Sequence, residues 1–205
     1  MRGRAGIGVL LAATALLGAA AEGVSAQSRS DRLALSSTHY ERFVRERHDA
    51  AVHERHLIGE LVDEAGRATF AVVHSYEPNR PAGHEAQAFA LRVDLSTPPG
   101  TEQVFTGWLD PYELEGLARA LPQLTPMMQA PGTVDHYVQV DFPRGAVSIG
   151  LRAAPGAGGP RLFIQVGKGG SRAFLDLDRF ATLQELVAAS VAKLHTLQRP
   201  SGHRH

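Results

Sequence analysis

The chain contains one pattern twice: Trp108-Leu109-Asp110 followed by Leu114, Leu117 and Leu121, and Phe174-Leu175-Asp176 followed by Phe180, Leu183 and Val187. Each copy runs from an aromatic residue, Leu and Asp into apolar residues at helical spacing. The match needs no gap, which predicts one strand–helix unit used twice. Alternation along a strand puts Trp108 and Phe174 on equivalent faces. We expect both rings to be buried where each sheet meets its helix.

Alternating or apolar segments separated by short turns precede each copy of this unit. They predict strands at 51–63, 67–75, 86–94 and 104–108, and again at 136–142, 146–152, 161–166 and 171–176. In the second half the predicted turns include 143–145. Short connections favour antiparallel pairing. The predicted fold is therefore α+β: two repeats of four antiparallel strands followed by a helix, with one helix packed on each sheet.

The first copy carries a strong helix start. Asp110 is the expected N-cap, Pro111 the first helical residue and Glu113 the partner in a capping box. Pro122 is expected to end this helix. The repeat predicts that Asp176 caps the last helix in the same way. A shorter helix is expected at 38–48, capped by Ser37 or Thr38.

Residues 1–26 have the three parts of a secretory signal peptide: Arg2 and Arg4, an uncharged apolar run over 5–21, and Val24-Ser25-Ala26 as the cleavage site. A membrane anchor is the competing interpretation, but the run is short and interrupted by glycine. We therefore expect an exported protein, periplasmic or secreted, with no membrane span after cleavage. The predicted organisation continues with a disordered leader (27–37), a first half (38–122), a linker (123–133), a second half (134–197) and a polar tail (198–205).

Composition limits the possible partners. The chain has no Cys, so an exported form holds together without disulfides. It has 21 Lys and Arg against 21 Asp and Glu, and removal of the signal leaves it close to neutral. A nucleic-acid-binding protein normally carries a net positive charge. The expected partner is an unknown protein or small-molecule ligand, and no nucleic acid.

His48, His53 and His56 form the densest group of titratable side chains and are the candidate metal ligands. A metal site needs such side chains on one face. His53 and His56 share a face on a helix and lie on opposite faces of a strand. The H-E-x-x-H motif is absent. His203 and His205, in the polar tail, are a weaker alternative, for which a solvated chain end is the simpler explanation.

No other motif predicts catalysis or a cofactor. The stretch 167–170, Gly-Lys-Gly-Gly, lacks the P-loop pattern and predicts a hairpin turn. Asp110 and Asp176 are explained by helix capping, and Tyr112 and Glu113 have no chemical equivalents in the second copy. Ser148 lies on a strand instead of a nucleophile elbow. We predict no catalytic residue.

Residues 108–121 resemble a motif of small exported bacterial proteins of unknown function, in which an aromatic–Leu–Asp strand end leads into a helix. The repeated plan of four strands and a helix is also similar to the Whirly fold. That resemblance implies binding of single-stranded DNA, but the basic motif of Whirly proteins has no counterpart here.

The sequence therefore favours an exported, non-catalytic binding or interaction domain. One alternative is a periplasmic metal-binding protein or enzyme that uses the histidines of 48–56. The other is a single-stranded nucleic-acid binder of Whirly-like topology.

Overall fold

The computed structural model describes residues 37–46, 51–78, 86–98, 103–129, 138–144, 146–155, 159–167 and 171–199. They lie within one compact unit, Ser37–His205. The predicted signal peptide, His48, Lys168 and the tail histidines lie outside the described residues. Among the described residues, no helix is long and apolar enough to cross a membrane.

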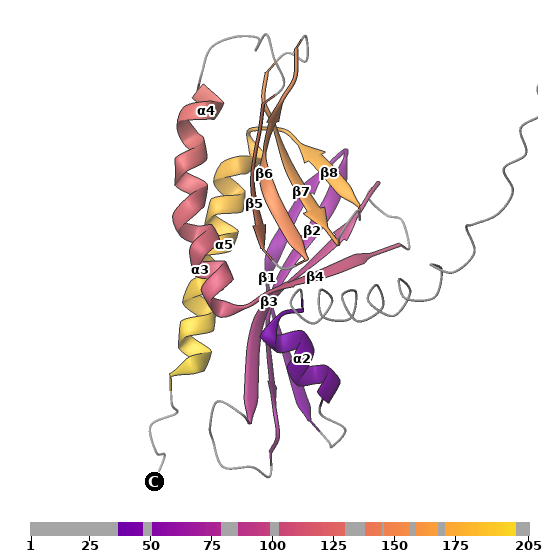
Figure 1. Cartoon of the computed structure of the whole chain (residues 1–205), viewed down its shortest axis with the longest axis vertical. Helices are drawn as coiled ribbons and strands as arrows, with labels where there is room; N and C mark the ends of the chain where they lie inside the picture. Colours follow the sequence, from indigo (N-terminus) through magenta and orange to yellow (C-terminus); the bar gives the residue numbers. More distant parts are fainter. Residues whose placement is uncertain are drawn as a thin grey trace, which may run out of the picture. The chain divides into compact units, whose positions relative to one another are not determined.

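Two four-stranded antiparallel sheets form the body of this unit (Figure 1). The first contains β1 (Val52–Asp63), β2 (Gly66–Tyr76), β3 (Gln87–Ser96) and β4 (Phe105–Leu109). The second contains β5 (Val138–Arg144), β6 (Val147–Ala153), β7 (Arg161–Val166) and β8 (Arg172–Leu175). In each sheet the strands follow their order in the chain. The predicted α+β class and antiparallel pairing are confirmed.

Each sheet is followed by a helix, as the repeated pattern predicts. α3 (Pro111–Ala120) follows the first sheet and α5 (Arg179–Gln198) follows the second. α2 (His39–Glu46) precedes β1 and corresponds to the short helix expected at 38–48. The arrangement is consistent with a duplicated unit.

The segment after α3 differs from the prediction. The chain passes Pro122 in a 3-10 turn, η1 (Leu121–Leu124), and then forms α4 (Thr125–Gln129), so the first part of the predicted linker is helical. Pro122 and Pro126 stand in the first turns of these short elements, where the missing N–H has no helical partner to lose. Leu121 and Leu124 are buried in the core and hold the segment against it.

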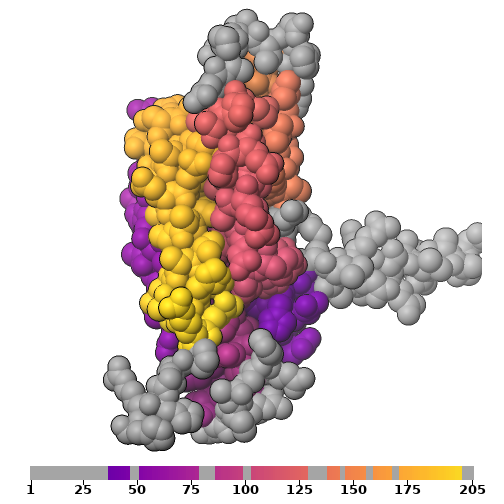
Figure 2. Space-filling view, turned by 90° about the vertical axis from the view of Figure 1, so that its left-hand side faces the viewer, coloured from indigo at the N-terminus to yellow at the C-terminus, as the bar shows by residue number. Residues whose placement is uncertain are grey.

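One hydrophobic core joins both sheets and the two long helices. Its residues include Leu91 and Leu109 from the first sheet, Ile164 and Leu175 from the second, and Leu183 from α5. α5 contacts β1, β2 and β3 of the first sheet as well as α3. Figure 2 shows α3 and α5 lying side by side. The helix of the second half thus covers the sheet of the first half, which differs from the expected packing of one helix on its own sheet.

The structure corrects the prediction that Trp108 and Phe174 are buried where each sheet meets the helix that follows it. Both rings occupy equivalent strand positions, but both are only partly buried. Leu109 and Leu175, each one residue later, are 1% exposed and point into the core. Alternation therefore directs the two aromatic rings to the outer faces of their sheets.

Asp110 does more than begin α3. The capping box with Glu113 is formed, and the Glu113 carboxylate accepts the Asp110 N–H at 2.9 Å. The Asp110 carboxylate also accepts the backbone N–H groups of His39 at 2.7 Å and Tyr40 at 3.2 Å. These are N–H groups of the first turn of α2, which have no partners within the helix. One buried carboxylate therefore ties α2 to the β4–α3 junction.

Asp176 does not repeat this role, so its predicted capping function is wrong. α5 begins at Arg179 with Asp178 as N-cap, and Asp178 makes no side-chain capping bond. Two more residues stand between strand and helix here than at Asp110. The backbone N–H of Asp176 instead donates to the Asp63 carboxylate, at 3.1 Å. This bond connects the β1–β2 turn to the end of β8.

The carboxyl of Asp63, at the end of β1, has a lowered pKa. Burial raises the pKa of its carboxyl, but hydrogen bonds from the backbone N–H groups of Asp176, Ala65 and Glu64, together with the Arg179 charge, lower it below the ordinary value. Because the folded-state pKa is depressed, this group stabilises the fold above its unfolded pKa. That contribution is lost as the pH falls through the folded pKa.

The first turn of the second half is shorter than predicted. Pro143 and Arg144 belong to β5, where Pro143 pairs with Ser148 and Arg144 with Val147. β5 is an edge strand. A proline is accommodated there because its missing N–H can face away from the ladder.

Candidate functional site

The histidines proposed from sequence do not converge. His53 lies on the outer face of the first sheet, where its Nδ1 is 2.7 Å from Ser75 Oγ. His56 lies on the other face of β1, as expected for residues three apart on a strand. Because these two side chains face apart, they cannot ligate one ion together. With His48 outside the described residues, metal binding by 48–56 stays a prediction.

His56 instead joins a cluster around Glu54. The Glu54 Oε2 atom is 3.5 Å from His56 Nε2 and 3.6 Å from His74 Nδ1. The hydroxyl of Tyr76 donates to Glu54 Oε1 at 3.4 Å. His56 Nε2 is buried and makes no hydrogen bond. Within the described part of the chain, no group of three or more His, Asp or Glu is arranged to hold a metal ion.

The sequence did not predict the contact of Glu54 with His74, because this contact depends on a β-bulge. The register of β1 against β2 shifts between Leu57 and Gly59, so that Glu54 pairs with His74. Without the extra residue, Glu54 would stand opposite Ser75 and its contact with His74 would be lost, whereas the contact with His56, two residues along the same strand, does not depend on the register. The hairpin itself was readable from the sequence, but the bulge had no sequence signal apart from Gly59.

The outer faces of the two sheets are covered differently. On the first sheet, α2 packs over Val73, Ala88 and Ala90 through Tyr40 and Phe43. Trp108 packs against this small cluster, with its ring 4.8 Å from that of Tyr40. The ring of Trp108 is thus part of a helix–sheet contact.

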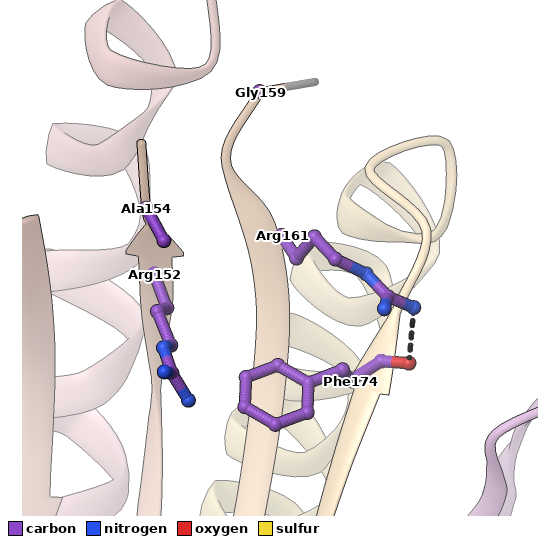
Figure 3. Close-up of a pocket in the computed structure, with 5 residues that line it drawn as sticks. All are labelled: Arg152, Ala154, Gly159, Arg161 and Phe174. Atoms are coloured by element: carbon purple, nitrogen blue, oxygen red, sulfur yellow. Dashed lines mark hydrogen bonds between the residues drawn. The ribbon is translucent and has the colours of Figure 1, made fainter. Parts of the chain in front are cut away.

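The equivalent ring of the second sheet lines an open pocket of about 210 Å³. Arg152, Ala154, Gly159, Arg161 and Phe174 line it, and we call it the basic aromatic pocket. None of these residues belongs to a helix. Figure 3 shows the Phe174 ring of β8 pointing across β7 toward Arg152 of β6, with Arg161 of β7 nearby. The guanidinium carbons of Arg152 and Arg161 lie 5.4 and 5.8 Å from the ring centroid.

Arg172 extends the positive surface along the same face. Its guanidinium lies 4.6 Å from the centroid of Phe163 and 5.9 Å from that of Phe174, and it donates to the side-chain oxygen of Gln165. Arg161 donates to the Phe174 carbonyl at 3.1 Å. Both hydrogen-bond partners are neutral. Among the described residues, no carboxylate forms an ion pair with Arg161 or Arg172.

This chemistry suits an anion with a planar group. Guanidinium groups bind carboxylates and phosphates through paired N–H donors. The face of Phe174 offers an apolar surface to a flat group. Cation–π attraction keeps the guanidinium groups close to the aromatic rings. No sequence motif predicts the pocket, because its residues come from three strands and their flanking loops, which lie close together only in the folded sheet.

Of the remaining candidates, Ser148 and the Gly-rich stretch have structural roles. Ser148 donates to Asp141 at 3.2 Å. β7 and β8 pair as an antiparallel hairpin, and Gly167 has φ +85° at its start, so the Gly-rich stretch connects two strands as predicted. Lys168, Gly169 and Gly170 lie outside the described residues. Tyr112 is 69% exposed at the start of α3.

Comparison with known proteins adds no assignment. No model of a known protein family matches the chain. A search of curated proteins also finds no match.

Proposed function

We propose that this protein is an exported, non-catalytic binding domain whose basic aromatic pocket takes a carboxylate ligand with a planar group. The observation that supports the proposal is the difference between two equivalent rings. Trp108 packs against the cluster under α2, whereas Phe174 lines an open pocket beside two arginines. Guanidinium groups beside an aromatic face in an open pocket are the chemistry that binds an anion with a planar group.

The size of the pocket favours one small group over a polymer. A volume of about 210 Å³ accommodates a single ring or side chain. Carboxylate has the planar, two-oxygen geometry that a guanidinium fork matches. The near-neutral composition also disfavours a nucleic acid, because affinity for a phosphate backbone depends on many cationic contacts.

Titration with benzoate tests this proposal against benzamide, which has the same shape without the charge. We expect saturable NMR shifts at Phe174 and Arg161 with benzoate, and binding of benzamide weaker by about tenfold, since the charge-assisted hydrogen bonds are lost. Arg161→Gln should weaken benzoate binding to a similar extent. Arg67→Gln is the matched control, because Arg67 is an exposed strand arginine of the first sheet paired with Glu60.

Three outcomes would overturn the carboxylate proposal. The first is equal binding of benzoate and benzamide, and the second is an effect of Arg67→Gln as large as that of Arg161→Gln. The third is preferential binding of an oligothymidylate with steep salt dependence, which would make this face a nucleic-acid surface. That result would favour the Whirly-like alternative.

Export is a separate part of the proposal and rests on the pattern of residues 1–26. When the full chain is expressed in a bacterial host, we expect a shortened form outside the cytoplasm whose N-terminus is at or near Gln27. N-terminal sequencing of the fractionated protein measures this. Intact chain that begins at Met1 and stays in the cytoplasm would contradict export.

A further inference from the structure

β3 runs past the end of its neighbour β4. The two strands pair from Leu95 opposite Phe105 to Leu91 opposite Leu109. Beyond that point Asp110 and Pro111 turn the chain into α3, while β3 continues to Gln87. Residues 87–90 therefore have β2 on one side and, in the part of the chain that the structure describes, no strand on the other.

This free edge carries unpaired backbone groups. Alternate residues of an antiparallel strand direct their N–H and C=O groups to opposite neighbours. Two of the residues 87–90 therefore point toward the side that β4 has left. They are Gln87 and Phe89, because Ala86 accepts the Glu77 N–H on the β2 side and alternation turns 88 and 90 the same way. No hydrogen bond between described residues reaches this side of 87–90. Unpaired edge groups of this kind are a template for an added strand.

A groove of about 560 Å³ lies along the same edge. It is lined by residues of β3, by the first turns of α2 and α3, and by the end of α5: Gln87, Ala88, Phe89, His39, Asp110, Pro111, Tyr112 and Gln198. We call it the β3-edge groove. None of its described lining residues is Lys or Arg, and the one carboxylate among them, Asp110, already accepts two N–H groups of α2.

We propose that the β3-edge groove binds an extended, uncharged peptide segment that pairs with residues 87–90 of β3. Backbone pairing at a sheet edge supplies affinity in such complexes, and flanking side chains supply selectivity. The electrically neutral lining disfavours a charged segment, which would lose its hydration without gaining a partner. This site is independent of the basic aromatic pocket on the second sheet and of its ligand.

The side chains around the β3 edge determine which kind of peptide side chain the groove can accept. Tyr112 is 69% exposed on the rim and Phe89 is 8% exposed on the floor. His74 stacks on Phe89 at 4.3 Å, and its Nε2 lies 3.3 Å from the side-chain oxygen of Gln87. With that oxygen held by the imidazole, the amide NH₂ of Gln87 is the group offered to a ligand. An apolar or aromatic peptide side chain fits between Tyr112 and Phe89.

The proposal can be tested by selecting peptides that bind the purified protein from a random-peptide display library. The selected peptides then serve as the probes. We expect enriched peptides whose affinity falls by about tenfold on Tyr112→Ala, since an aromatic contact is lost. N-methylation of alternate nitrogens in a synthetic copy should abolish binding, while N-methylation of the intervening nitrogens should be tolerated. Amide NMR signals of residues 87–90 should shift on binding. Phe174→Ala is the control and should leave the affinity unchanged.

Several results would overturn the peptide site. One is a selection that yields no peptide sensitive to Tyr112→Ala. Another is an equal effect of N-methylation at every position, which excludes strand pairing. A third is enrichment of acidic or basic peptides that respond to Phe174→Ala, which would place binding on the second sheet.

Discussion

Replacing Asp110 by alanine is expected to lower the free energy of unfolding by about 2–4 kcal/mol, because hydrogen bonds to a charged, buried group are lost and their partners remain. The Asp110 carboxylate is 4% exposed and bonds the N–H groups of His39 and Tyr40. Without it, the first turn of α2 loses two acceptors that water cannot easily replace. The expected loss exceeds that of an ordinary exposed helix cap.

Two measurements distinguish this role from general destabilisation. Chemical denaturation gives the loss of stability, and the emission of Trp108, the one tryptophan of the chain, reports the docking of α2 through its contact with Tyr40. We expect a red shift of emission in Asp110→Ala under native conditions. Asp178→Ala is the matched control, because Asp178 begins α5 without a capping bond and its side chain is 70% exposed. Equal stability of the two variants would show that Asp110 does not tie α2 to the sheet.

Gly107→Ala is expected to destabilise the protein by about 1–3 kcal/mol, as overpacking of a core does. A Cβ atom at this position would stand 2.7 Å from Val147 Cγ2, 3.0 Å from Val166 Cγ1 and 3.3 Å from the Ala146 carbonyl oxygen. Gly107 lies on β4, and these neighbours lie in or beside β6 and β7. The glycine therefore allows the two sheets to approach each other. The branched Cβ of valine restricts its rotation about χ1, and both valines are buried, so they turn away only at a cost in free energy.

Gly59→Ala is a control with a contact of similar length. Its new Cβ would stand 2.6 Å from Leu186 Cδ2, the end of a flexible, partly buried side chain on α5. Leu186 can change rotamer, whereas the Val147 and Ala146 atoms near Gly107 cannot move without their strands. Thermal or urea unfolding of both variants should show the larger loss for Gly107→Ala. The opposite order would mean that the sheets separate easily and that Gly107 does not limit their packing.

The strands of both sheets were predictable from alternation and turn residues. The hairpin of β1 and β2 and the hairpin of β7 and β8 connect apolar or alternating segments through glycine-containing turns, and local chemistry decides such elements. The start of α3 was equally clear, because Asp110, Pro111 and Glu113 act within one turn of a helix. These signals depend on residues near each other in the chain.

The packing partners were not predictable in the same way. The apolar stripe on α5 predicts that one face of the helix is buried, but it does not predict which sheet that face packs against. α5 covers β1, β2 and β3 because the two sheets share one core with α3. Likewise, Phe174 repeats the strand position of Trp108, but the cover over Trp108 comes from α2, which precedes β1 and lies outside the repeated strand–helix pattern.

By itself the sequence determined the fold class, the two sets of four antiparallel strands, the helix that follows each set and the cap at Asp110. Tertiary structure alone decided three things: the contact of Glu54 with His74, the free edge of β3, and the basic aromatic pocket. The first depends on a one-residue bulge, and the second on where β4 leaves its partner. The third depends on arginines from β6 and β7 meeting a ring on β8. Local periodicity sets which face of a strand is apolar, whereas strand register and the cover over each outer face are set by contacts between residues far apart in the chain.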